Sequence, residues 1–221
     1  MKKYSDLLLL IIASGTLVLI LLATSGWIEP VTARMQPVQI RTTWIQAAPD
    51  LSQLKSGDLI FRHGRGFISN AFQKLSKEDP RYSHAGIIEV ENGQAFVYHC
   101  IGGEENKSNK MKRETLSAFC RPDHNHTFGI YRTDLNPKQM KKVLSGLNEY
   151  YKQGLEFDTD FSLDTDDKMY CTEMVYKLLT NAIGDKNFLP LTHISGRTYV
   201  SCDNIYLSSH CREIYSYDYR N

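Results

Sequence analysis

Residues 84–101 read HAGIIEVENGQAFVYHCI and decide the fold of this 221-residue chain. Two apolar runs, residues 84–90 and 95–101, flank the tetrapeptide ENGQ at residues 91–94. An Asn-Gly pair between two such runs is a strong signal for a β-hairpin. Pairing across the four-residue loop places residue 90 opposite 95 and residue 86 opposite 99. His84 and His99 then lie diagonally on one face of the hairpin, about 7–8 Å apart between Cα atoms.

Further strands are predicted on both sides of this hairpin. Gly57 and Asp58 form a turn before a short apolar strand, and residues 127–132 (TFGIYR) form another strand. Residues 107–113 are polar and are predicted to be an exposed strand or loop. The tail from Thr198 alternates aromatic and polar residues, which is typical of an edge strand. Together with the helices described next, this pattern predicts an α+β fold with an antiparallel sheet.

Three helices are predicted from apolar residues at helical spacing. The first covers residues 67–75, and the second begins at Pro137 and ends at Gly154. The third carries Cys171 near its start, ends before Gly184, and has residues 164–167 (DTDD) as candidate N-caps. A helix N-terminus lowers the pKa of a thiol, although neighbouring acids oppose this effect. By periodicity alone, Cys171 is better explained as a small core residue.

The first 28 residues are predicted to be a membrane anchor or signal segment. Residues 7–23 (LLLLIIASGTLVLILLA) contain no charge, and as a helix they would span roughly 26 Å, near the lower limit for crossing a bilayer. Lys2 and Lys3 precede this run, so the N-terminus is expected in the cytoplasm and the remaining chain on the periplasmic or extracellular side. The alternative is secretion after signal cleavage, although residues 23–25 (ATS) are a poor cleavage site.

The rest of the chain is predicted to contain a linker and one domain. Residues 29–50, which include three prolines, are assigned to the linker, and residues 51–221 to the domain. The chain has 26 Lys and Arg residues against 25 Asp and Glu, so no basic surface for nucleic acid is expected. The sequence leaves the oligomeric state open.

Neither a metal nor a cofactor is predicted. The possible zinc ligands are Cys100, Cys171, His84, His99, His124 and His126. However, the chain has no C-x-x-C, H-x-x-x-H or H-E-x-x-H motif and no phosphate-binding glycine motif. Five cysteines are an odd number for an exported protein, which predicts at least one free thiol. A bridge between Cys202 and Cys211 is compatible with their spacing and stays open.

Four motifs resemble the YiiX/YebB-like cysteine hydrolases: GDLIF (57–61), YSHAGI (82–87), FVYH (96–99) and MYCTEMV (169–175). That family is a circularly permuted branch of the NlpC papain-like superfamily, in which the His strand precedes the Cys helix. The resemblance covers residues 50–215 and implies a permuted papain-like domain there, which follows the one transmembrane helix predicted from residues 7–23. It implies Cys171 as nucleophile, His84 as general base and a polar third residue, here His99. An acid is common at that third position in the bacterial branch, whereas the related lecithin retinol acyltransferase-like proteins have a His there.

Together with the predicted anchor, the resemblance implies a membrane-anchored thiol hydrolase that cleaves an amide or ester in a cell-wall peptide or lipid. His84 would take the proton of Cys171, and the thiolate would form a thioester that water cleaves. The alternative is a catalytically silent papain-like module that binds an envelope lipid or peptide. Alkylation by iodoacetamide is expected to separate them, because an activated thiolate reacts well below pH 8 and an inert thiol follows a pKa of about 8.5.

Overall fold

The computed structural model describes residues 43–221, except for the side chains of Ile68 and Glu104. The predicted membrane segment and residues 29–42 of the predicted linker lie outside the described residues. Within residues 43–221, no helix is long and apolar enough to cross a membrane.

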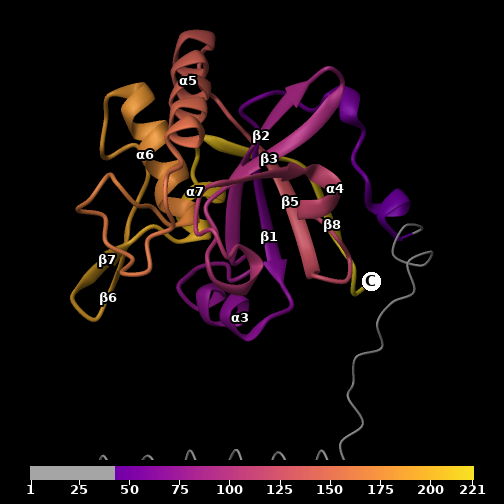
Figure 1. The fold of residues 1–221 in the computed structure, drawn as a ribbon, viewed down its shortest axis with the longest axis horizontal. Coiled ribbons are helices and arrows are strands. Elements are labelled where there is room, and N and C mark those ends of the chain that lie inside the picture. The colour runs from indigo at the N-terminus through magenta and orange to yellow at the C-terminus, as the bar shows by residue number, and fades with distance from the viewer. Residues whose placement is uncertain (1–42) are drawn as a thin grey trace, which may run out of the picture. The chain divides into compact units, whose positions relative to one another are not determined.

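A six-stranded antiparallel sheet forms the centre of the domain, with the strand order β4-β3-β2-β1-β5-β8 (Figure 1). Its strands in chain order are β1 (Leu59–Gly64), β2 (His84–Glu91), β3 (Gln94–His99), β4 (Lys112–Thr115), β5 (Asn125–Thr133) and β8 (Cys211–Asp218). The β2–β3 hairpin has the predicted register, with Val90 opposite Ala95 and Ile87 opposite Tyr98. The prediction of an α+β fold with an antiparallel sheet is confirmed.

Helices lie on both faces of this sheet. They are α3 (Phe67–Gln73), α4 (Leu116–Phe119), α5 (Pro137–Gln153), α6 (Cys171–Ile183) and α7 (Cys202–Tyr206), with short 3-10 turns η1 (Leu51–Gln53) and η2 (Gly103–Glu105). A separate hairpin joins β6 (Thr192–Ile194) to β7 (Arg197–Tyr199). In Figure 1, α5, α6 and α7 lie on one side of the sheet, and α4 lies on the other.

Two apolar cores result, one on each face of the sheet. The larger core joins β1, β2 and β3 to α5, α6 and α7, and the smaller one lies beneath α4. Residues 43–47 are helical, and two of them belong to the smaller core: Ala47, which is fully buried, and Trp44, which packs against it. The Trp44 ring lies 6.2 Å from that of Phe128, and the Tyr215 hydroxyl donates a 3.1 Å hydrogen bond to the Ala47 carbonyl. Residues 43–47 of the predicted linker therefore contact the sheet.

Several predicted element boundaries differ from those in the structure. The helix from Pro137 to Gly154 is confirmed, and Gly154 ends it with a φ of 69°. The first predicted helix stops at Gln73, and the polar segment becomes a strand only at Lys112. The tail does supply the edge strand β8, but this strand starts at Cys211, because the residues after position 198 first finish β7 and form α7.

Gly86 allows β2 and β3 to approach each other at the point where both carry a histidine. A Cβ atom at residue 86 would lie 2.7 Å from Cγ1 of Val97 and 3.3 Å from Cβ of His99. A contact of 2.7 Å is too short for two carbon atoms, so any larger residue would displace the β3 side chains. The glycine of the HAGI motif therefore preserves the position of His99.

Candidate active site

The two predicted histidines contact each other at the same end of the hairpin. His84 is the first residue of β2 and His99 is the last residue of β3. Nε2 of His84 lies 2.8 Å from Nδ1 of His99, a hydrogen-bond distance, and the ring centroids are 5.0 Å apart at an angle of 81°. The pairing predicted from the hairpin register is confirmed.

Phe119 of α4 covers both imidazoles. Its ring stacks on His84 with centroids 5.8 Å apart and meets His99 edge-on at 5.1 Å. His99 is fully buried and His84 is 7% exposed. Burial lowers the pKa of His84 well below its usual 6.5 and that of His99 to about 4, with nearby Arg62 acting in the same direction. Both rings are therefore neutral at pH 7.

A glutamate that the sequence did not indicate lies behind His99. Oε1 of Glu114, on the edge strand β4, lies 3.1 Å from Nε2 of His99, in an orientation too oblique for a straight hydrogen bond. Its other oxygen lies 2.7 Å from Nζ of Lys112. Burial alone would raise the pKa of Glu114, but contacts with His99 and Lys112 lower it to about 2. Glu114 is therefore a carboxylate at neutral pH.

Cys171 is the first residue of α6, which packs against β2. Tyr170 is the N-cap, and Oε2 of Glu173 accepts a 3.2 Å hydrogen bond from its backbone N–H. The Tyr170 hydroxyl accepts a 2.9 Å hydrogen bond from the Val200 N–H, and Oγ1 of Thr172 donates one of 2.6 Å to the Val200 carbonyl. The prediction that Cys171 lies near the start of the helix is confirmed. The predicted caps at residues 164–167 are wrong, because they lie in the preceding loop.

Cys171 is partly accessible to solvent, and backbone N–H groups lie close enough to its sulfur to favour the thiolate. Burial raises its pKa, while N–H groups of Ala85, Thr172 and Cys171 itself, together with the charge of Arg62, act against this rise. The net effect is a raised pKa, so the predicted lowering is wrong. The helix N-terminus does favour the thiolate, but loss of hydration outweighs it, and the resting group is a thiol.

The Ala85 N–H that contacts this sulfur belongs to the residue next to His84. The three predicted site residues therefore lie around one corner of the sheet, where β2 begins, β3 ends and α6 begins. All five cysteines are free, so the bridge left open between Cys202 and Cys211 is not formed.

Arg62 is a buried cation beside this corner. It is 5% exposed and pairs with His84 across β1 and β2. One guanidinium nitrogen donates a 3.1 Å hydrogen bond to the Phe119 carbonyl, and another lies 2.8 Å from Oε2 of Glu105. The guanidinium carbon lies 4.5 Å from the Phe119 ring centroid. The only indication in the sequence that Arg62 is buried beside the site was its position directly after the apolar run LIF at residues 59–61.

We expect Arg62→Met to slow alkylation of Cys171 by iodoacetamide about tenfold at pH 7.5, which corresponds to a rise of about one unit in the thiol pKa. The cause is the loss of the positive charge that favours the thiolate. Arg62→Lys keeps a charge and serves as the matched control, for which we expect less than a threefold change. Equal rates for Arg62→Met and the wild type would contradict this role.

Glu173 is a buried acid two residues after Cys171. Its side chain is fully buried, and its Oε1 lies 2.9 Å from Nζ of Lys177. Burial raises the pKa of Glu173 from 4.5 to about 7, against the opposing effects of Lys177 and the Tyr170 N–H. Because the folded pKa is the higher one, its stabilising effect is complete below pH 4.5 and is lost as the pH rises through 7.

We expect the free energy of unfolding of the wild type to fall by about 2 kcal/mol between pH 4.5 and 8, relative to Glu173→Gln. Glutamine keeps a neutral acceptor for the Tyr170 N–H and does not ionise. Urea denaturation at several pH values measures this difference. Glu149→Gln, at an exposed position of α5, is the control and should follow the wild type. A parallel pH dependence for wild type and Glu173→Gln would refute the assignment.

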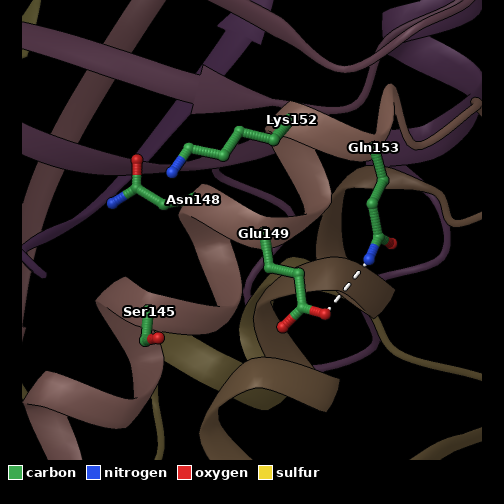
Figure 2. A pocket seen from close by; sticks show the side chains of 5 residues that line it. All are labelled: Ser145, Asn148, Glu149, Lys152 and Gln153. Carbon is green, nitrogen blue, oxygen red and sulfur yellow. Dashed lines mark hydrogen bonds between the residues drawn. The ribbon is translucent and has the colours of Figure 1, made fainter.

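A surface hollow lies apart from these residues. It has a volume of about 710 Å³ and is lined by Ser145, Asn148, Glu149, Lys152 and Gln153 of α5 (Figure 2). Gln153 donates a 3.1 Å hydrogen bond to Glu149 across it. None of the predicted site residues lines this hollow. Within residues 43–221, no three His, Cys, Asp or Glu side chains are grouped so that they could hold a metal.

An antiparallel sheet with a histidine on an early strand and a cysteine at the start of a later helix is the arrangement expected of the permuted papain-like class of cysteine hydrolases. Residues 53–196 match the family described as permuted papain-like amidase enzyme, YaeF/YiiX, C92 family. The chain belongs to this family. The predicted resemblance is therefore confirmed, and the description of the family agrees with the prediction of a cysteine hydrolase-like enzyme.

Two Escherichia coli proteins are similar to this chain. Uncharacterized protein YiiX of strain K12 is 28% identical over 134 residues, which cover 60% of this chain and 60% of that protein. The chain thus aligns with less than two thirds of this curated relative. A crystal structure described as metalloprotein yiiX from strain O157:H7 has a TM-score of 0.59 and 23% identity, over 75% of this chain and 98% of that chain. The structural likeness confirms the fold.

Proposed function

We propose that the protein is a thiol hydrolase that cleaves an amide or ester through Cys171, His84 and His99. The observation that carries this proposal is the 2.8 Å contact between His84 and His99, at the end of β2 against which the helix that begins at Cys171 packs. A nucleophilic thiol needs a base, and the base needs a group that orients it. In this proposal His84 is the base for the Cys171 thiol, and His99 is the group that orients His84.

The reaction begins from neutral groups, since burial raises the pKa of Cys171 and lowers that of His84. As the sulfur attacks the carbonyl carbon, its proton passes to His84. The N–H groups of Cys171 and Thr172 at the start of α6 stabilise the oxyanion. Protonation of the leaving group by His84 leaves a thioester on Cys171. His84 then takes a proton from water, which attacks the thioester and releases the acid. The sulfur leaves as a thiolate and takes that proton back from His84, which restores the two neutral groups.

We propose a peptide or lipid of the cell envelope as the substrate, and the amidase description of the family favours an amide bond. The test is to incubate the full chain separately with purified peptidoglycan and with phospholipid vesicles, and to analyse the products by mass spectrometry. A new amine identifies amide cleavage, and a released fatty acid identifies ester cleavage. If neither product exceeds that of Cys171→Ala, the hydrolase proposal fails and the silent binding module replaces it.

We also propose that residues 1–28 anchor the domain in the membrane, with the domain on the exported side. The uncharged run at residues 7–23 supports this proposal. The test is N-terminal sequencing of the protein after separation of membranes by carbonate washing. An intact N-terminus in the washed membranes supports the anchor. A shortened chain in the soluble fraction supports secretion after cleavage instead.

A further inference from the structure

We infer that Glu114 is a positioning residue, which fixes the protons of His99 and His84 so that the bare nitrogen of His84 is left for Cys171. This inference rests on the proposed function, because it concerns how its general base is prepared. Glu114 touches neither the thiol nor the substrate position and acts through His99.

The contacts form a line of three side chains. Oε1 of Glu114 lies 3.1 Å from Nε2 of His99, whose Nδ1 lies 2.8 Å from Nε2 of His84. The middle member, His99, is fully buried, so water does not compete for its two nitrogens. Nδ1 of His84 is the one ring nitrogen of the pair that this line leaves free.

The line determines where each proton lies. The nitrogen of His99 that lies 3.1 Å from the Glu114 carboxylate is the one that carries the proton. A bare nitrogen there would place its lone pair against a negative charge, whereas the positive end of an N–H is attracted to that charge even without a straight hydrogen bond. A neutral imidazole has one N–H group, and Nδ1 of His99 is therefore an acceptor. Nε2 of His84 must then donate to it, which leaves Nδ1 of His84 without a proton. This bare nitrogen is the base that Cys171 requires.

The same line stabilises the charge that forms in the reaction. When Nδ1 of His84 takes the thiol proton, the ring becomes a cation whose Nε2–H points at His99. This second proton can move to Nδ1 of His99, which places the positive charge next to the Glu114 carboxylate. Arg62 and Lys112 both oppose a positive charge on His99, and Glu114 is the acid that counters them. Glu114 thus supplies the negative charge that a histidine in the third position lacks.

The test compares Glu114→Ala, Lys112→Met and the double variant Glu114→Gln with Lys112→Met, all in the full chain. Lys112 contacts the outer oxygen of Glu114, so Lys112→Met keeps the carboxylate beside His99 and is the matched control. In the double variant, no cation competes for the amide oxygen, which is free to face His99. One readout is the proton position in each ring, from nitrogen NMR of 15N-histidine. The other is hydrolysis of 4-nitrophenyl acetate.

We expect His99 to be protonated on Nε2 and His84 on Nε2 in the wild type and in Lys112→Met. Glu114→Ala should mix the two forms in both rings and lower kcat at least tenfold with KM unchanged. The double variant should restore the proton positions but only part of kcat, because glutamine accepts from the His99 N–H but carries no negative charge. The inference is overturned if Glu114→Ala keeps the proton positions and the kcat of the wild type. It is also overturned if His99 of the wild-type protein is protonated on Nδ1. Either result contradicts only the role of Glu114 if Cys171→Ala is inactive in the same assay, because the hydrolase proposal is then still supported.

Discussion

Cys171→Ala is expected to lower the turnover of 4-nitrophenyl acetate by about 10³-fold or more, to the rate of the free histidines in the site. Without the sulfur no thioester forms. Direct attack of water on the ester is then accelerated only by binding of the substrate and by the N–H groups at the start of α6. Burst kinetics with the ester measure the loss. The burst of nitrophenol should disappear completely.

Cys211→Ala is the matched control for this loss. Cys211 is also a free and partly buried thiol, but it lies on β8 and outside the candidate site. Its removal should leave the burst unchanged. Circular dichroism should show that both variants keep the fold, since one partly accessible sulfur contributes little to the core. Full turnover by Cys171→Ala would disprove the nucleophile assignment.

His84→Ala is expected to lower kcat by about 10²- to 10⁴-fold, the usual contribution of a general base. Because burial lowers its pKa well below 6.5, His84 is neutral throughout the neutral range. The acid limb of the wild-type kcat/KM profile should therefore lie below pH 6.5, and activity should fall as protonation removes the base. Added imidazole should restore part of the activity of His84→Ala.

His193→Ala is the control for the histidine substitution. His193 is exposed on β6, where its ring contacts Oγ1 of Thr198 at 3.0 Å. This variant should keep both kcat and the pH profile. If His84→Ala loses no activity, or if the acid limb of the wild type lies above pH 6.5, then His84 is not the base that the geometry indicates.

The central hairpin was predictable because its determinants are local. An Asn-Gly turn and two apolar runs specify the pairing, and Val90 is indeed opposite Ala95. The contact between His84 and His99 follows from that register and from Gly86. The start of α6 at Cys171 was also close to its predicted place, because the apolar spacing after Met169 is regular.

The electrostatics of the site were not predictable in the same way. Arg62 and Glu114 reach the histidines from β1 and from the edge strand β4, and only the folded sheet brings them there. The raised pKa of Cys171 depends on its burial, which the sequence does not measure. The iodoacetamide profile suggested by the sequence therefore does not separate enzyme from binding module, since an active thiol with a raised pKa also reacts slowly below pH 8.

A direct measurement of the central claim is the mass of the full chain after brief incubation with 4-nitrophenyl acetate at pH 7.5, stopped with acid so that hydrolysis of the thioester does not continue. The account predicts the addition of one acetyl group, mapped by peptide sequencing to Cys171, and its disappearance when the acid is added only after the ester has been consumed. It also predicts no acetylated thiol in Cys171→Ala. Acetylation of another residue, with Cys171 unmodified while the ester is turned over, would contradict the account.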